Sequence, residues 1–131
     1  MAYTGVAVSD PVFDTCFANQ QLGYSTAAQS AVTQLTSKST AVTANTSNVQ
    51  ITMNNAALAA GAIVSFTLNN SLLSARDVLI VNVSGGIATA GTYTAFVSNV
   101  GTGSATISLY NISGGSLSEA VKLNLAIIHG Q

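Results

Sequence analysis

The sequence has very few charged residues. Asp, Glu, Lys and Arg make up 5% of its 131 residues, against about a quarter in ordinary soluble domains. The basic residues, Lys38, Arg76 and Lys122, are scattered along the chain. Because phosphate binding needs clustered Lys and Arg, this pattern excludes a nucleic-acid partner. The net charge of -1 also gives weak self-repulsion, so we expect the protein to work within an assembly.

Cysteine, histidine and tryptophan are scarce or missing. Cys16 is the only cysteine, which excludes an intrachain disulfide and a paired-cysteine metal site. His129 is the only histidine, and the carboxylates that a Ser-His-Asp triad would need, Asp77 and Asp14, lie far from it in the sequence. There is no GxSxG motif, and no Trp to line a sugar groove. We expect no enzymatic activity, no cofactor and no metal, although one ion shared on an oligomer axis stays open.

Long apolar runs are also missing. The most apolar segment, AALAAGAIVSFTL from Ala56, is shorter than the roughly 18 residues that a membrane-spanning helix needs. The first twenty residues lack the basic start and the apolar run of a secretion signal. We therefore expect no membrane partner and no export by that route. The Asn-x-Ser/Thr sequons then carry little weight as glycosylation sites.

From residue 31 onward the sequence consists of short β-branched runs separated by Asn, Gly and Ser. In AIVSFTLN, for example, Val64, Phe66 and Leu68 alternate with polar residues, as in a strand with one wet face. Many short strands with turn residues between them are typical of a sandwich. We predict an all-β fold, an eight-stranded antiparallel sandwich that is jelly-roll-like. The runs begin at Ala31, Thr40, Val49, Ala62, Asp77, Thr92, Ser104 and Ala120.

Three segments depart from this simple pattern. VLIVNV (78–83) is apolar on both faces, which predicts a central strand or one whose outer face another subunit covers. NNAALAAG (54–61) predicts a helical turn capped by Asn54 or Asn55 and ended by a left-handed Gly61. SLSE (116–119) predicts a local turn bonded by Ser116, or an acidic contact for a partner.

One motif occurs twice, as NVSGG from Asn82 and NISGG from Asn111. Each copy follows an apolar run and precedes a strand-like segment. We predict that both mark chain reversals in which the paired glycines supply positive φ angles. Glycine-rich turns that hold phosphate run into helices instead, so nucleotide binding is not expected.

The first thirty residues have no sustained period. We predict an irregular N-terminal arm over residues 1–30, followed by a sandwich domain over residues 31–131. Exposed aromatic side chains usually pack on their own domain or on a neighbour. The predicted partner-binding residues are the aromatics of the arm, Tyr3, Phe13, Phe17 and Tyr24. Arg76 and Asp77 form a second candidate contact, either a clamp for a neighbouring subunit or a solvated turn.

Residues 33 to 130 also resemble a known family. The segments TSKSTAVTANTSNVQITMNNAALAAGAIVSFTLNNS and NISGGSLSEAVKLNLAII are similar to a small β-sandwich module of virion structural proteins in tailed bacteriophages. Such modules occur as capsid decoration (cement) proteins and as distal domains of tail fibres, commonly as trimers. The resemblance therefore implies a virion component, and a chain with little room for a fibre shaft favours the cement protein.

We therefore expect a homotrimer on the outer capsid surface that bridges neighbouring copies of the major capsid protein. Binding to the assembled lattice but not to its parts would stabilise the shell by mass action. The alternative is a receptor- or glycan-binding distal domain of a tail fibre, with contacts from the loops at Asn82 and Asn111. A hydrolase or metal-dependent enzyme is a third hypothesis, and it would require His129.

Overall fold

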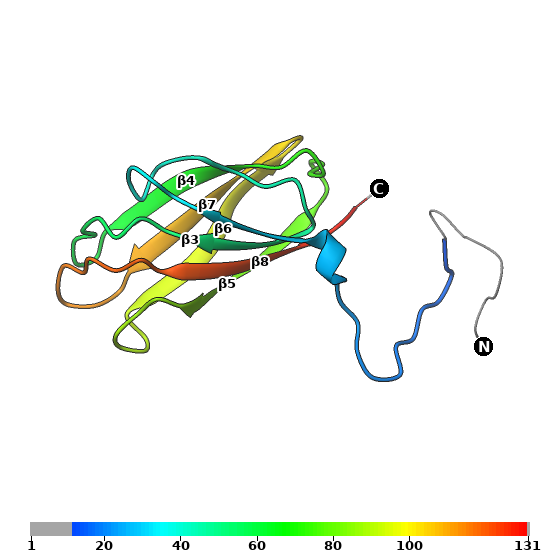
Figure 1. The fold of residues 1–131 in the computed structure, drawn as a ribbon, viewed down its shortest axis with the longest axis horizontal. Coiled ribbons are helices and arrows are strands. Elements are labelled where there is room, and N and C mark those ends of the chain that lie inside the picture. Colours follow the sequence, from blue (N-terminus) through cyan, green and yellow to red (C-terminus); the bar gives the residue numbers. More distant parts are fainter. Residues whose placement is uncertain (1–11, 131) are drawn as a thin grey trace.

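The computed structural model describes residues 12–130, and eight strands form two four-stranded sheets that pack face to face (Figure 1). Sheet A has the order β1-β3-β8-β5, and sheet B has the order β2-β4-β7-β6. The predicted all-β, eight-stranded sandwich is confirmed, and each predicted run overlaps one strand. The strands are β1 (Gln29–Thr33), β2 (Val42–Thr43), β3 (Asn48–Thr52), β4 (Ile63–Asn69), β5 (Val78–Gly85), β6 (Tyr93–Gly101), β7 (Ser104–Asn111) and β8 (Lys122–Ile128).

The strand pairing departs in part from the all-antiparallel, jelly-roll-like expectation. The pairs β3–β8, β5–β8, β4–β7 and β6–β7 are antiparallel, whereas β1–β3 and β2–β4 are parallel. The reason lies in the path of the chain, which alternates between the sheets from β1 to β6. Successive strands reverse direction but lie in opposite sheets, so strands two apart in the sequence run the same way within one sheet.

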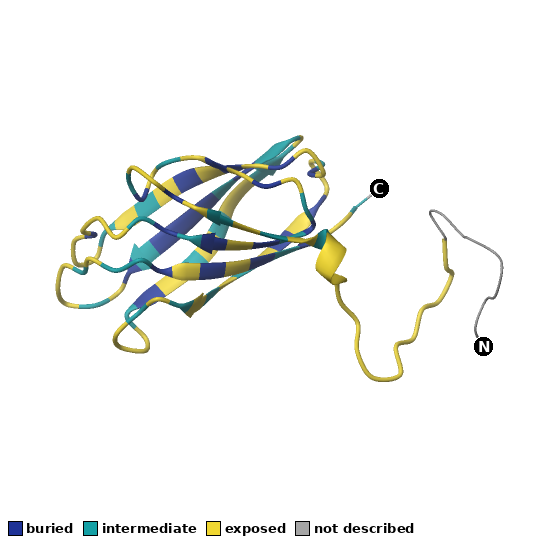
Figure 2. Cartoon of the chain, in the orientation of Figure 1, coloured by how far each residue is buried: buried dark blue, intermediate teal, exposed yellow. Residues whose placement is uncertain are grey.

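The core lies between the sheets and is almost wholly aliphatic. Side chains alternate along each strand, so that buried and exposed residues follow one another (Figure 2). Burying one large aliphatic side chain contributes about 1.5–3 kcal/mol. The fully buried residues include Val49 and Ile51 of β3, Leu68 of β4, Ile107 and Leu109 of β7, and Leu123 and Ile127 of β8.

The predicted helical turn at 54–61 is wrong. The segment has no helix and ends in a turn at residues 60–61, and Leu58 pairs with Leu117 as an isolated antiparallel bridge with backbone hydrogen bonds of 2.8 and 3.0 Å. A helix of two turns is unstable by itself, whereas the bridge satisfies the backbone and buries Leu58. Gly61 does have the predicted positive φ, 71°. In the SLSE segment, the predicted local bond of Ser116 is not found among the described residues, and the Glu119 carboxylate instead accepts the distant Ala88 N–H at 3.0 Å.

The NVSGG and NISGG segments both lie at one end of the sandwich, which we call the turn end. The arm and residue 130 lie at the opposite end, which we call the arm end (Figure 1). The prediction that the paired glycines supply positive φ is wrong for three of the four. Only Gly86 has a positive φ, 73°, whereas Gly85, Gly114 and Gly115 do not. The first copy is largely part of β5, which continues to Gly85 through an irregularity after Val83.

Candidate functional site: an apolar arm and a polar relay at the arm end

The arm is extended and largely exposed over the residues that the structure describes. Its aromatic side chains Phe13 and Phe17 are 65% and 90% exposed. A single 3-10 turn, η1 (Thr26–Ala28), connects the arm to β1, which begins at Gln29, two residues before the predicted domain boundary. Figure 1 shows the blue chain leaving the sandwich beyond this turn. The arm therefore presents apolar side chains to whatever surrounds the protein.

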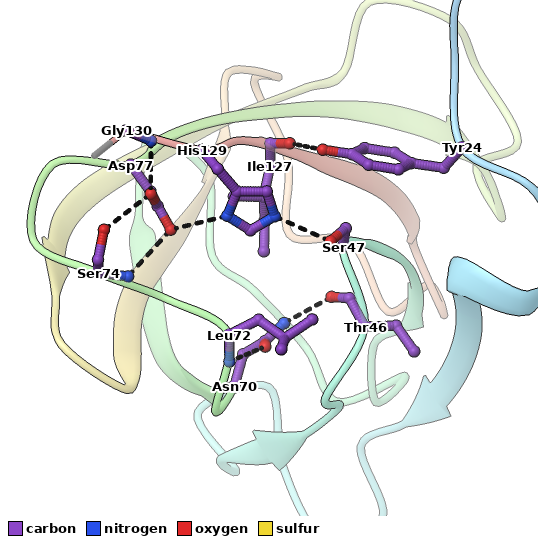
Figure 3. Close-up of polar contacts among 10 residues, drawn as sticks. All are labelled: Tyr24, Thr46, Ser47, Asn70, Leu72, Ser74, Asp77, Ile127, His129 and Gly130. Carbon is purple, nitrogen blue, oxygen red and sulfur yellow. Dashed lines mark hydrogen bonds and ion pairs between the residues drawn. The ribbon is translucent and has the colours of Figure 1, made fainter. Parts of the chain in front are cut away.

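Tyr24 fixes the base of the arm to the sandwich. Its hydroxyl donates a hydrogen bond to the backbone carbonyl of Ile127 in β8 (Figure 3). Of the four predicted partner-binding residues, Phe13 and Phe17 are thus free of the domain and Tyr24 anchors the arm. Tyr3 lies outside the described residues.

An exposed apolar strip lies on the outer face of sheet A. It consists of two cross-strand pairs between β5 and β8, Val78 with Ile128 and Ile80 with Ala126. We call these four residues the outer strip. Ile80 is 53% exposed, and Val78 and Ile128 are exposed to a similar degree. The prediction that VLIVNV forms a central strand is wrong, because β5 lies at the edge of sheet A.

A groove joins the base of the arm to the outer strip. It has a volume of about 480 Å³, and its walls include Leu22 and Tyr24 from the arm and Ala126, Ile128 and His129 from the end of β8. Most of this lining is apolar. The base of the arm, the groove and the strip therefore form one continuous apolar region at the arm end of sheet A.

A polar relay lies beside this region and joins three segments far apart in the sequence. His129 Nδ1 is 3.2 Å from the Asp77 carboxylate, and His129 Nε2 is 2.9 Å from Ser47 Oγ (Figure 3). Asp77 also accepts hydrogen bonds from the Gly130 N–H at 2.8 Å and from the N–H and hydroxyl of Ser74 at 2.9 and 2.8 Å. The relay ties the start of β3, the turn before β5 and the segment after β8 together.

The hydrogen bonds to Asp77 favour its ionised form. The N–H groups of Ser74 and Gly130 lower the pKa of this carboxyl to about 2 from an ordinary value of 3.8, although burial acts in the opposite direction. Asp77 is therefore turned into the domain, away from the clamp position proposed for it. Its neighbour Arg76 remains exposed.

The relay has the connectivity of a nucleophile, a base and an orienting acid. Catalysis would require a substrate carbonyl to reach Ser47 Oγ, with hydrogen-bond donors around the developing oxyanion. Ser47 is only 9% exposed, and its backbone carbonyl accepts the Ile127 N–H at 2.9 Å. We interpret the relay as a structural staple. Asp77 and His129 are far apart in the sequence, and the fold brings them together. The sequence did not predict Ser47, because the TSN tripeptide around it gives no signal.

If the relay is structural, Asp77→Asn should alter the acid dependence of folding. A carboxylate with a lowered pKa in the folded state stabilises the fold above pH 4, and this contribution disappears as the pH falls from about 4 to 2. The urea midpoint of the wild-type protein should therefore fall between pH 4 and pH 2. The Asp77→Asn variant should have a lower midpoint than wild type at pH 7, and its midpoint should fall less over this pH range. Circular dichroism during urea titration measures both quantities.

Asp14→Asn is the matched control, because Asp14 is an exposed carboxylate of the arm. It should leave the profile between pH 2 and 7 as in wild type. An Asp77→Asn profile identical to wild type would contradict the structural role. Covalent labelling of Ser47 by a fluorophosphonate would also contradict the structural role, because it would show that the hydroxyl is accessible and activated.

A second polar cluster lies at the turn end. The Lys38 side chain is buried, and its ammonium donates to the backbone carbonyls of Asn54 and, at 2.6 Å, Glu119. Burial lowers the pKa of Lys38, and the Glu119 charge partly opposes this effect. Burial, with a smaller contribution from Glu119, raises the pKa of Tyr93 to about 12. The two bonds of Lys38 tie the loop before β2 to the segments that follow β3 and precede β8.

Within residues 12–130, no three His, Cys, Asp or Glu side chains come together as metal ligands do. None of the helical structure described here is long and apolar enough to cross a membrane. No protein-family model, curated protein or solved structure matches the chain. The class of protein is therefore defined by its architecture, a β-sandwich with an exposed apolar arm.

Proposed function

We propose that the protein is a phage capsid decoration (cement) protein that binds the assembled shell and stabilises it by bridging neighbouring capsid subunits. The observation that carries this proposal is the arm, which exposes Phe13 and Phe17 and is anchored at its base by Tyr24. A free monomer gains nothing from large exposed apolar side chains, whereas a protein held by neighbours buries them. The low charge of the chain fits the same role.

The proposed mechanism is mechanical and needs no chemistry. Copies of the chain, arranged as homotrimers on the outer capsid surface, bury apolar area across seams between copies of the major capsid protein. Each contact is weak, but many contacts on one shell act together. Because the protein binds the lattice and not its dissociated parts, it raises the free energy needed to open the shell.

Quantitative mass spectrometry of purified particles tests the location. A cement protein should be present at a near-stoichiometric ratio to the major capsid protein. A few copies per particle would contradict the proposal and support the distal domain of a tail fibre, with a receptor or a glycan as its ligand.

The arm itself can be tested by removing its exposed aromatics. We expect F13S/F17S to lower retention on purified capsids at least tenfold while the urea midpoint of the free protein is unchanged, since neither side chain is packed in the domain. Retention is measured by sedimentation of particles after a wash. The matched control L35S/I63S removes two exposed apolar side chains outside the arm and should retain binding. Equal retention of both variants would exclude the arm as the adhesive element.

A further inference from the structure

Two apolar surfaces of this chain are exposed. One is the arm segment 12–17, VFDTCF, with exposed side chains at Val12, Phe13 and Phe17. The other is the outer strip of β5 and β8, built from two cross-strand apolar pairs. Neither surface is covered by the rest of the described chain, as the run of exposed residues along the arm in Figure 2 illustrates. Burial of both would be favourable.

The charges beside the two surfaces are complementary. Asp14 is the only charged residue of segment 12–17, and Arg76 stands two residues before Val78, where the outer strip begins. Both are exposed, and neither forms an ion pair within residues 12–130. The strip itself contains no charged residue. An arm segment lying along the strip can therefore bury its aromatics and place its carboxylate near Arg76.

The length of the arm allows this contact to be made with another copy. The thirteen residues from Val12 to Tyr24 can span about 45 Å when extended, at roughly 3.3–3.6 Å per residue. The longest strand, β6, has nine residues and spans about 30 Å. The arm is thus longer than the sandwich that carries it, and it runs away from its own strip rather than across it (Figure 1).

We propose that segment 12–17 of one copy docks on the outer strip of a second copy, with Asp14 facing Arg76 of the strip. The occupant of the exposed face of sheet A is then a second chain of the same protein. This inference rests on the proposed function only in that linked copies would hold one another on the shell. It adds a specific contact and gives the exposed Arg76 a role in it.

The native cysteine of the arm offers a direct test. Cys16 lies within segment 12–17 and is exposed, so a cysteine placed on the strip of another copy should form a disulfide with it. Wild-type chain, which supplies Cys16, is mixed with isotope-labelled C16S/I80C chain under mild oxidation, without capsids. Mass spectrometry of the digested mixture then counts the disulfides that join position 16 of one copy to position 80 of the other.

The control chain is C16S/T67C, because Thr67 is exposed on the outer face of sheet B. We expect the strip cysteine to react at least tenfold faster than this control. The substitution D14R in the arm chain should reduce the strip reaction to the control rate, and pairing D14R with R76D in the strip chain should restore it. C16S/V78C provides a second strip position in case I80C folds poorly.

Two outcomes would overturn the proposal. Equal rates for the strip and the sheet B control would show that the arm does not select the strip. A disulfide formed mainly within one monomer, in a chain carrying both Cys16 and I80C, would show that the arm covers its own strip. Either result leaves the capsid ratio and the F13S/F17S retention test unaffected, so failure here is distinguishable from failure of the proposed function.

Discussion

Gly86→Ala should lower the free energy of unfolding by about 3 kcal/mol or more, the largest effect that we expect from a single methyl group in this chain. Gly86 has φ 73°, in the left-handed region, where a β-carbon is strained. A Cβ at this position would also lie 2.0 Å from the backbone oxygen of Ala120. The clash involves backbone on both sides, so no side-chain rotation can relieve it.

Gly85→Ala is the matched control for this variant. Gly85 is the preceding residue of the same pair, has no positive φ, and has open space where a Cβ would lie. Its substitution should change stability by less than about 0.5 kcal/mol. Urea titration of both variants measures the difference. If the two alanine variants unfolded at the same urea concentration, the close approach of Gly86 to Ala120 would not be a constraint on the fold.

Asn111→Asp should cost about 3 kcal/mol or more of stability at neutral pH. The Asn111 side chain is fully buried, and its Nδ2 donates to the backbone carbonyls of Leu58 and Gly115, both at 2.9 Å. Its Oδ1 accepts from the N–H and the hydroxyl of Ser113 at 3.0 and 2.7 Å. A carboxylate keeps the shape but cannot donate, so each of the two carbonyls loses one of its hydrogen bonds and faces a buried negative charge.

The first asparagine of the other motif copy, Asn82, provides the control. Asn82 occupies the same place in NVSGG, but it is exposed on β5, and within residues 12–130 its side chain bonds only the carbonyl of Val83, at 3.3 Å. Asn82→Asp should therefore be nearly neutral. Thermal unfolding of both variants at pH 7 gives the comparison. A small loss for Asn111→Asp, equal to that of Asn82→Asp, would mean that the turn end does not depend on this amide.

The strands could be predicted because their signal is local. Alternation such as Val64, Phe66 and Leu68 against Ser and Thr reflects the two faces of a strand, and each face has one environment in the folded protein. The order and direction of the strands could not be predicted in the same way. The parallel pairing of β1 with β3 follows from the switch of the chain between sheets, and a switch of this kind leaves no periodic pattern.

The two glycine pairs have similar sequences but different structures. NVSGG and NISGG have the same turn residues, but the first copy is largely strand, and the second is a loop organised by buried Asn111. Similar residues thus have different roles because their neighbours come from other parts of the chain. The relay of Ser47, Asp77 and His129 is a product of topology for the same reason, since 82 residues separate its ends.

The position of β8 has a consequence for how the protein is made. This strand is last in chain order, yet it lies inside sheet A and pairs with both β3 and β5. Until β8 has emerged from the ribosome, β5 has no partner in its sheet, and half of the outer strip does not exist. Folding therefore waits for the end of the domain, as expected where contacts join distant parts of the sequence. A nascent chain cut short before residue 122 would keep the exposed arm but only the β5 half of the outer strip.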